Sequence, residues 1–485
     1  MINFRILYRT IGTLLSIEAA MMLTCFIMAV AYGEDDRFAL GTSFVIVSIV
    51  AISMRIHGRH SGNSLNRREA YLIVASTWIV FSLLGMLPLL LSGYERSVTD
   101  VFFETMSGFT TTGVTTIDDV ERLPHGILFW RSLMQWIGGL GIVFFTIALL
   151  PSLVGGSVKV FAAEATGPIR SKMHPRLSTT AKWIWSVYVL LTIACGLSFW
   201  AAGMDWFDAL NYSMTTTATG GFSTHNGSTV FFNSSTIEYL SILFQFLAGI
   251  NFTLLYMSVF RLRIGTVARN AEFRLYVGII LVATLFIMYM LVTRLHYHYE
   301  PAFRSALFQV VSFITTTGLS NDNAGMWPQI TWFVLGGLMF VGACGGSTTG
   351  GFKCIRVLML FKVLRNEFRH ILHPNAVLPV KVGGQSIPQS RLVSLLAVFL
   401  LYVCMLLLIT VLMSTSGIDF TNSVTIALSL VSNVGAGLDT NIGSVMSWAD
   451  LSDLLKWLSA LLMLVGRLEI MAVLVLFTPS FWKEN

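Results

Sequence analysis

A short glycine-containing segment occurs four times in this chain. The copies, called loops one to four, are Thr110–Thr115, Ala218–Ser223, Thr315–Ser320 and Val434–Asp439. Each copy follows a short apolar segment and lies between two long hydrophobic stretches. Glycine tolerates the backbone angles that turn successive carbonyl oxygens to one side, and carbonyl oxygens can replace the water shell of a monovalent cation. The four loops therefore predict a cation pathway lined by backbone oxygens.

The central residues of each loop are the candidate cation ligands. They are Thr111, Thr112, Gly113, Thr219, Gly220, Gly221, Thr316, Thr317, Gly318, Gly435, Ala436 and Gly437. None of them is acidic, whereas divalent-selective pores more often use rings of carboxylates. The pattern therefore favours K⁺ bound at these filter residues. Because not every loop has two glycines, we expect a filter shorter than that of a K⁺ channel, with some Na⁺ permeation.

The composition is that of a multi-pass, all-α integral membrane protein. Mean hydropathy is +0.73 and only 12% of the 485 residues are charged, whereas soluble proteins carry roughly 25%. A bilayer crossing needs about 20 apolar residues. Ten stretches are predicted to meet this requirement: 10–32, 38–56, 70–93, 126–151, 181–202, 236–260, 273–293, 328–352, 391–414 and 454–478.

Basic residues predict the orientation. Most of the 31 lysines and arginines fall in connections that an even number of crossings would place on one side, such as the run from Lys353 to Arg369. The positive-inside rule then predicts that both termini are cytoplasmic. The net charge of +6 is explained by contact of these loops with membrane lipid head groups, so we expect no nucleic acid partner.

The loops belong to longer internal repeats. A shift of 108 residues places Asp100 on Asp208 and Gly113 on Gly221, and a shift of 205 places Gly113 on Gly318. The repeated unit is an outer helix, a pore half-helix, a loop and an inner helix. The predicted divisions are two leading transmembrane helices in 1–68, then pore repeats in 69–179, 180–271, 272–389 and 390–485. Four such repeats would surround one pore with pseudo-fourfold symmetry.

Two further features lie on the inner helices. The third inner helix contains the glycine-rich segment Gly342–Gly351, and its glycines and β-branched threonines predict a helix break. The candidate gate residues are Gly345, Gly346, Ser347, Thr348, Thr349, Gly350 and Arg467. Arg467 lies in the middle of the fourth inner helix, where an arginine costs about 3 kcal/mol unless it faces water or a partner. The glycine-rich segment lacks the Gly-Lys-Ser/Thr ending of a P-loop, so no nucleotide site is expected.

Together these motifs are similar to those of the Trk/Ktr/HKT superfamily of potassium uptake proteins, and the two leading helices resemble its bacterial TrkH branch. The resemblance implies four K⁺-channel-like repeats around one pore and a homodimer in the bacterial inner membrane. It also implies a cytosolic TrkA-type regulatory subunit that binds nucleotide. It assigns the filter to Gly113, Gly221, Gly318 and Gly437, gating to the glycine-rich segment, and a barrier to Arg467. The adjacent Gly220 and Gly435 leave the register of loops two and four open.

The titratable residues and the histidines bear on two functions other than a gated pore. A symporter that couples K⁺ to H⁺ or Na⁺ needs a buried titratable residue, and Glu18, Glu104 and Glu469 are candidates. Four pore repeats nevertheless differ from the inverted repeats of many transporters. An enzyme is not expected, because the nine histidines form no HExxH motif and no Ser/His pair is apparent.

Overall fold

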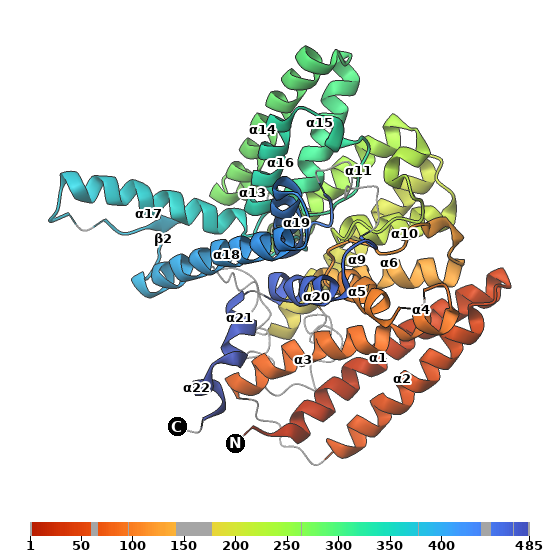
Figure 1. Ribbon diagram of the computed structural model, residues 1–485. Coiled ribbons are helices and arrows are strands. Elements are labelled where there is room, and N and C mark those ends of the chain that lie inside the picture. Colours follow the sequence, from red (N-terminus) through yellow and green to blue (C-terminus); the bar gives the residue numbers. More distant parts are fainter. Residues whose placement is uncertain are drawn as a thin grey trace.

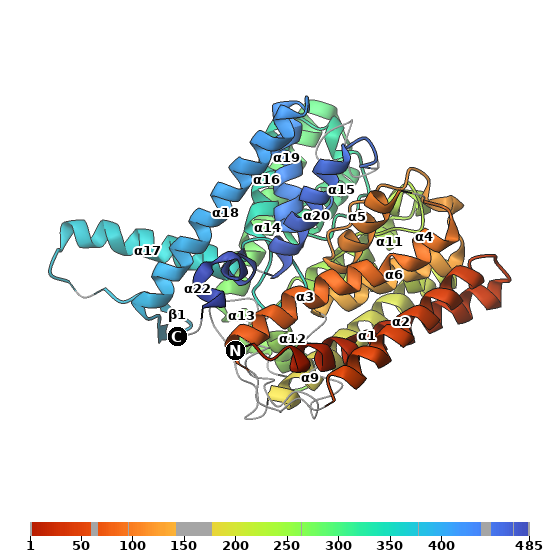
Figure 2. The ribbon, with the colours of Figure 1, turned by 60° about the horizontal axis from the view of Figure 1, so that its bottom comes forward.

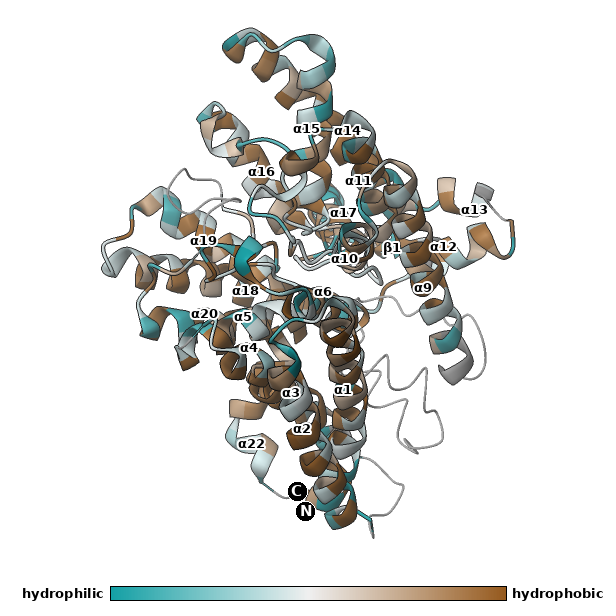
Figure 3. Ribbon diagram, turned by 90° about the vertical axis from the view of Figure 1, so that its right-hand side faces the viewer, coloured by the Kyte–Doolittle hydropathy of each residue, from teal (hydrophilic) through white to brown (hydrophobic). Residues whose placement is uncertain are grey.

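The computed structural model describes residues 2–59, 66–95, 97–141, 177–262, 264–376, 378–437, 448–468 and 470–483. Within these ranges the chain is mostly helical, and the one sheet is the hairpin of β1 (Lys381–Val382) and β2 (Gln385–Ser386). The helices are apolar along most of their length and the connections are more polar (Figure 3). The protein is therefore a multi-pass helical membrane protein.

Two long helices precede the repeats. Helix α1 (Phe4–Tyr32) and helix α2 (Arg37–His57) are joined by a short turn and pack against each other along their length (Figure 1). Gly33 ends α1 in the left-handed conformation with φ of 72°, which glycine adopts without a Cβ penalty. Helix α1 also packs against the first repeat, so this pair lies on one flank of the molecule.

The first half of the chain then contains two units of similar order. The first is α3 (Arg67–Gly85), α4 (Leu87–Ser92), α5 (Val98–Phe109) and α6 (His125–Leu140). The second is α9 (Leu177–Ala201), α10 (Trp206–Thr217), α11 (Ser235–Ala248) and α12 (Phe252–Val259), followed by the short α13 (Ile264–Ala268).

The second half contains two more units. One is α14 (Ala271–Leu295), α15 (Tyr299–Ile314), α16 (Gln329–Val341) and α17 (Cys354–Leu372). The other is α18 (Gln389–Thr415), α19 (Phe420–Ser432), α20 (Asp453–Leu468) and α21 (Ile470–Leu474), followed by α22 (Pro479–Trp482). The start of α1 and helix α22 lie on the same side of the molecule in all three views (Figures 1, 2 and 3).

The short helices α5, α10, α15 and α19 run up to the four loops. Asp and Ser side chains cap three of them: Ser97 accepts from the amide of Asp100, Asp205 from that of Phe207, and Asp419 from that of Thr421. Such caps satisfy amides that have no partner within a helix. Each short helix stops where its loop begins, so its negative C-terminal end faces that loop.

The inner helices differ from the sequence expectation. Six helices in the described ranges are long and apolar enough to cross a membrane, or eight when two bent pairs are counted as single spans. The predicted span 236–260 bends by 107° between α11 and α12, and 454–478 bends by 113° between α20 and α21. The predicted span 328–352 is helical only to Val341, and 126–151 is described only to residue 141. Of the ten predicted crossings, the break within 328–352 was expected from its glycines, whereas the bends within 236–260 and 454–478 were not, because hydropathy records composition and not helix continuity.

Candidate functional site

The four loops share one backbone pattern. In each, two residues in the left-handed region are separated by one residue that is not. The first of these residues are Thr111, Thr219, Thr316 and Asn433, with φ of 53°, 55°, 55° and 54°. The second are Gly113, Gly221, Gly318 and Gly435, with φ of 83°, 82°, 76° and 79°. A β-branched residue rarely adopts positive φ, and such strain persists only where the surroundings enforce it, often at functional sites.

This pattern corrects the alignment of loop four. Gly435, not Gly437, occupies the position equivalent to Gly113, and Asn433 takes the place of the left-handed threonine. Asparagine is one of the few residues that visit this conformation readily. In loop two the equivalent glycine is Gly221, as expected. Leu438 and Asp439, at the end of loop four, lie outside the described residues.

The four loop glycines form a closed ring. A Cβ added to any of them would overlap the carbonyl oxygen that precedes the glycine of the next loop. The pairs are Gly113 with Gly220, Gly221 with Thr317, Gly318 with Val434, and Gly435 with Thr112. Because the fourth pair returns to loop one, the loops enclose a common centre, and any side chain at these positions would break the contact.

Backbone hydrogen bonds orient the carbonyl oxygens of the loops. The amide preceding each ring glycine donates back to its own short helix. The bonds are Thr112 to Ser107 (2.9 Å), Gly220 to Thr215 (2.9 Å), Thr317 to Ser312 (2.8 Å) and Val434 to Ser429 (2.9 Å). In a trans peptide the carbonyl oxygen lies opposite the amide hydrogen. The carbonyls that share a peptide group with these amides therefore point away from the short helices; they belong to Thr111, Thr219, Thr316 and Asn433.

A buried ion pair lies behind loop one. Arg131 on α6 contacts Glu104 on α5 at 2.7 Å, and the two side chains are 2% and 1% exposed. Glu104 also accepts from the amide of Thr116 (3.0 Å). Arg131 lies over the ring of Phe222, 4.2 Å from its centroid. The pair therefore joins loop one to loop two, and sequence reasoning identified Glu104 but missed its partner.

The glycine-rich segment is an irregular stretch between α16 and α17. Gly342, Gly346 and Gly351 have positive φ of 66°, 78° and 72°. The break predicted for Gly342–Gly351 in the third inner helix is therefore present, and it extends to Lys353.

The glycine-rich segment lies directly against the loops and the short helices. The amide of Gly350 donates to the Thr316 hydroxyl at 2.7 Å, and that of Gly351 donates to the carbonyl of Ser432 at 3.0 Å. The Thr348 hydroxyl donates to the carbonyl of Thr217 at 3.1 Å. Through these contacts with three of the four units the segment lies beside the C-terminal ends of α10, α15 and α19.

Two polar residues anchor the other end of the segment. The Glu272 carboxylate accepts from the amide of Gly345 (2.6 Å), and Asn251, between α11 and α12, donates to the Gly345 carbonyl (2.5 Å). Sequence reasoning missed both residues, since they are 73 and 94 positions away in the chain.

Arg467 is in contact with this segment. Its Nη1 donates to the carbonyl of Thr348 at 2.8 Å, and its Nη2 donates to the carbonyls of Gly138 and Gly139 at 2.5 and 2.6 Å. The structure thus brings together the two predicted gate features, the arginine and the glycine-rich segment. Glu469, the nearby acidic candidate, lies outside the described residues.

Comparison with known proteins identifies the family of this chain. A family model described as a cation transport protein, TrkH, matches residues 37–484. The chain belongs to the TrkH family. The Trk system potassium uptake protein TrkH of Salmonella typhimurium is 36% identical over 99% of this chain and 100% of that protein. The Escherichia coli protein TrkG is 34% identical over 99% of each chain.

A solved TrkH-family structure has the same fold. The crystal structure of the potassium transporter TrkH from Vibrio parahaemolyticus superposes with a TM-score of 0.89 at 34% identity, covering 99% of this chain and 100% of that chain. The family resemblance expected from the motifs is therefore confirmed. These relatives are transport proteins, which fits the expectation that this TrkH-family chain is not an enzyme.

Proposed function

We propose that this chain takes up K⁺ across the bacterial inner membrane through a gated, cation-selective pore that also passes some Na⁺. The observation that carries the proposal is the closed ring of loop glycines, each against the carbonyl of the next loop. Four loops that each turn a carbonyl away from the preceding short helix would supply fixed oxygens without a trapping charge. The names of the TrkH and TrkG relatives support K⁺ as the transported ion.

The filter ligands would come from the strands that form the ring. They are residues 111–113, 219–221, 316–318 and 433–435. In this assignment Ala436 and Gly437 lie one and two positions beyond the ring glycine of loop four. The C-terminal ends of α5, α10, α15 and α19 add partial negative charge toward the bound K⁺.

The gate would be the glycine-rich segment together with Arg467. In this proposal the segment lies across the inner side of the ring; its bond to Thr316 and the bond from Arg467 to the Thr348 carbonyl support this position. A guanidinium near the pathway also repels a passing cation. Opening would require the segment to move away from the ring and the bonds of Arg467 to break.

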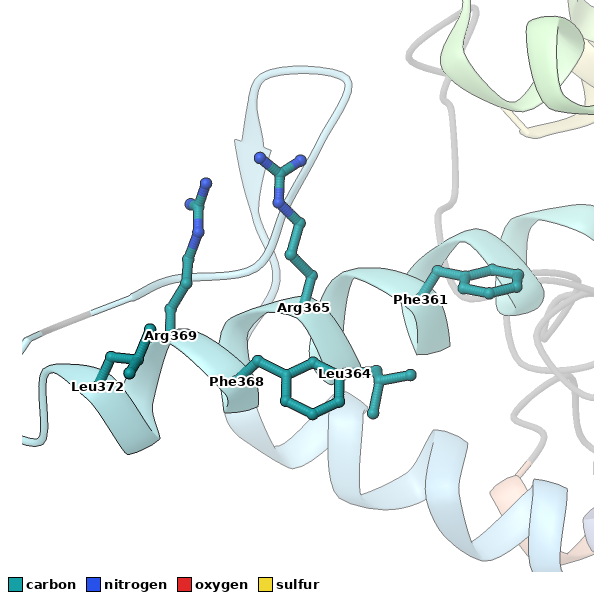
Figure 4. Close-up of a pocket in the computed structure, with 6 residues that line it drawn as sticks. All are labelled: Phe361, Leu364, Arg365, Phe368, Arg369 and Leu372. Atoms are coloured by element: carbon teal, nitrogen blue, oxygen red, sulfur yellow. The ribbon is translucent and has the colours of Figure 1, made fainter.

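The charge and exposure of surface residues support further parts of the proposal: the orientation of the chain and its protein partners. Cytoplasmic termini, four pore repeats with the divisions given above, and a homodimer fit the basic loops and the fold. A cytosolic TrkA-type nucleotide-binding subunit would contact the basic run from Lys353 to Arg369. On α17, Phe361, Leu364 and Phe368 are exposed. Arg365 and Arg369 extend side by side from the same stretch of helix (Figure 4). Such a mixture of apolar and basic side chains suits a protein partner.

Coupled transport is the alternative, and the environment of Glu104 weakens it. Glu104 is paired with Arg131, so a change at Glu104 would leave the arginine buried without its partner. Glu18 is buried, and its oxygens have no hydrogen-bond partner within the described part of the chain. Glu18 is therefore the residue on which a coupled mechanism would depend.

Single-channel recording of the purified protein in planar bilayers tests the proposal. With K⁺ on one side and Na⁺ on the other, we expect discrete currents that reverse toward the K⁺ equilibrium potential. Deletion of residues 345–350 should raise the open probability. If no currents appear and vesicles take up K⁺ in proportion to an imposed proton gradient, the pore proposal is wrong.

A further inference from the structure

Loop two is held differently from loops one and three. In loop one the hydroxyls of Thr110 and Thr112 hydrogen bond at 2.8 Å, and in loop three Thr315 and Thr317 repeat this bond at 2.8 Å. Loop two has Ala218 and Gly220 at the equivalent positions. It therefore has no hydroxyl pair to brace the residue before its ring glycine.

A glutamine from the first repeat takes the place of this brace. Gln135 on α6 is fully buried, its Nε2 donates to the carbonyl of Gly220 at 2.8 Å, and its Oε1 accepts from the amide of Phe222 at 3.0 Å. A Cβ added to Gly220 would overlap the amide group of Gln135. Gly220 is thus a glycine because the glutamine amide occupies the space of a side chain.

The hydrogen bond from Gln135 is made to an oxygen of the glycine ring. The Gly220 carbonyl that accepts from Gln135 is the same oxygen that lies against Gly113. We propose that Gln135 is a positioning residue for cation selectivity: it fixes the Gly220 carbonyl at the junction of loops one and two. This inference rests on the proposed filter. Selectivity depends on the number and field strength of the oxygens around the ion, so a Gly220 oxygen free to turn would discriminate less between K⁺ and Na⁺.

The second repeat contains a matched control. Gly139 of α6 packs against Ala218, and Gly249, after α11, packs against Thr315, so these glycines are equivalent. The offset of 110 residues places Gln245 at the position of Gln135. Gln245 is fully buried, and neither of its amide atoms has a hydrogen-bond partner among the described residues. Loop three has its own hydroxyl pair and does not use this glutamine.

The test measures the K⁺/Na⁺ permeability ratio of the full-length protein in planar bilayers. Gln135→Met retains about the same volume and removes both bonds. We expect the ratio to fall by about fivefold, the effect of losing the one hydrogen bond that holds the Gly220 carbonyl. Gln245→Met should leave the ratio unchanged. A merely structural role would lower the yield of folded protein and the flux of both ions, but not their ratio.

A rescue variant completes the design. Gly220→Thr by itself should clash with Gln135 and impair transport. Combined with Gln135→Ala and Ala218→Thr, it recreates the hydroxyl pair of loops one and three, and we expect the ratio to recover. The inference is overturned if Gln135→Met keeps the wild-type ratio, or if the triple variant is no better than Gly220→Thr.

Failure of the filter proposal would look different. Gly318→Ala places a side chain against the Val434 carbonyl and should change the ratio whatever Gln135 does. If Gly318→Ala changes the ratio and Gln135→Met does not, only the role of Gln135 is wrong. If neither variant changes it, the filter assignment itself is wrong.

Discussion

Arg467 and Thr348, 119 positions apart in the chain, are joined by a 2.8 Å hydrogen bond from the guanidinium to the carbonyl oxygen. The same guanidinium donates to Gly138 and Gly139 at the end of α6. One side chain of the fourth unit therefore ties the glycine-rich segment to the first unit. A planar guanidinium can make these three bonds at once, whereas an ammonium is a single point of charge.

Replacing Arg467 should favour the open state. Arg467→Ala removes three charge-assisted bonds, each worth about 1.5–3 kcal/mol, and we expect at least about a tenfold rise in open probability in single-channel records. Arg467→Lys retains the charge but loses the planar guanidinium that makes the three bonds, so its open probability should be intermediate. Equal open probability in the wild type and Arg467→Ala would show that these bonds do not hold the closed state.

The register of loop four can be tested with two glycines. Gly435→Ala would introduce a Cβ at φ of 79° that overlaps the Thr112 carbonyl, and we expect loss of K⁺ selectivity. Gly437 corresponds to Thr115 of loop one, a position that already carries a side chain, so Gly437→Ala should be tolerated. Reversal potentials measured for both variants decide the register, and the opposite result would restore the sequence alignment.

The ion pair behind loop one should contribute to stability. Arg131→Met leaves the Glu104 carboxylate buried without its charged partner, and such changes cost about 3–5 kcal/mol. The double variant Arg131→Met, Glu104→Gln removes both charges and should recover much of this loss. Thermal unfolding of the detergent-purified variants measures the effect, and a single variant as stable as the wild type would contradict it.

Glu18 distinguishes a pore from a coupled transporter. If K⁺ moves passively, Glu18→Gln should keep K⁺ flux within about twofold of the wild type, because glutamine has nearly the same volume as glutamate and a passive pore needs no titratable group there. Proton flux, followed with a pH-sensitive dye inside the vesicles, should be absent in both proteins. A variant that loses proton-driven K⁺ uptake while remaining folded would favour coupling.

Asp36, in the turn between α1 and α2, predicts a pH effect on stability. Burial and the nearby Glu34 carboxylate raise the pKa of Asp36 to about 6, above the value of about 3.9 in an unfolded chain. Between these values the folded protein binds the extra proton, so the contribution of Asp36 to stability falls as pH rises through this window. Asp36→Asn should therefore raise the melting temperature relative to the wild type at pH 7.5 but not at pH 4. An equal difference at both pH values would exclude Asp36 as the cause.

Composition and local motifs determined much of this protein in advance. Hydropathy along the chain identified a multi-pass helical protein, because crossing a membrane requires long apolar helices whatever their partners. Shifts of 108 and 205 residues aligned Gly113 with Gly221 and Gly318, and the structure gives all three the same backbone conformation. These signals are readable because glycine adopts positive φ without the steric cost that other residues meet.

The tertiary structure decided what depends on contacts between distant residues. Loop four diverges in sequence, and only the left-handed φ of Asn433 and Gly435 shows its register. No periodic pattern in the sequence indicates the bends in the inner helices. The same holds for the bonds of Arg467 to residues 328 and 329 positions away and for the contact of Gln135 with Gly220. The bonds of Arg467 and Gln135 depend on which backbone carbonyl lies opposite the side chain after the four units have packed. The identity of a residue does not specify that neighbour.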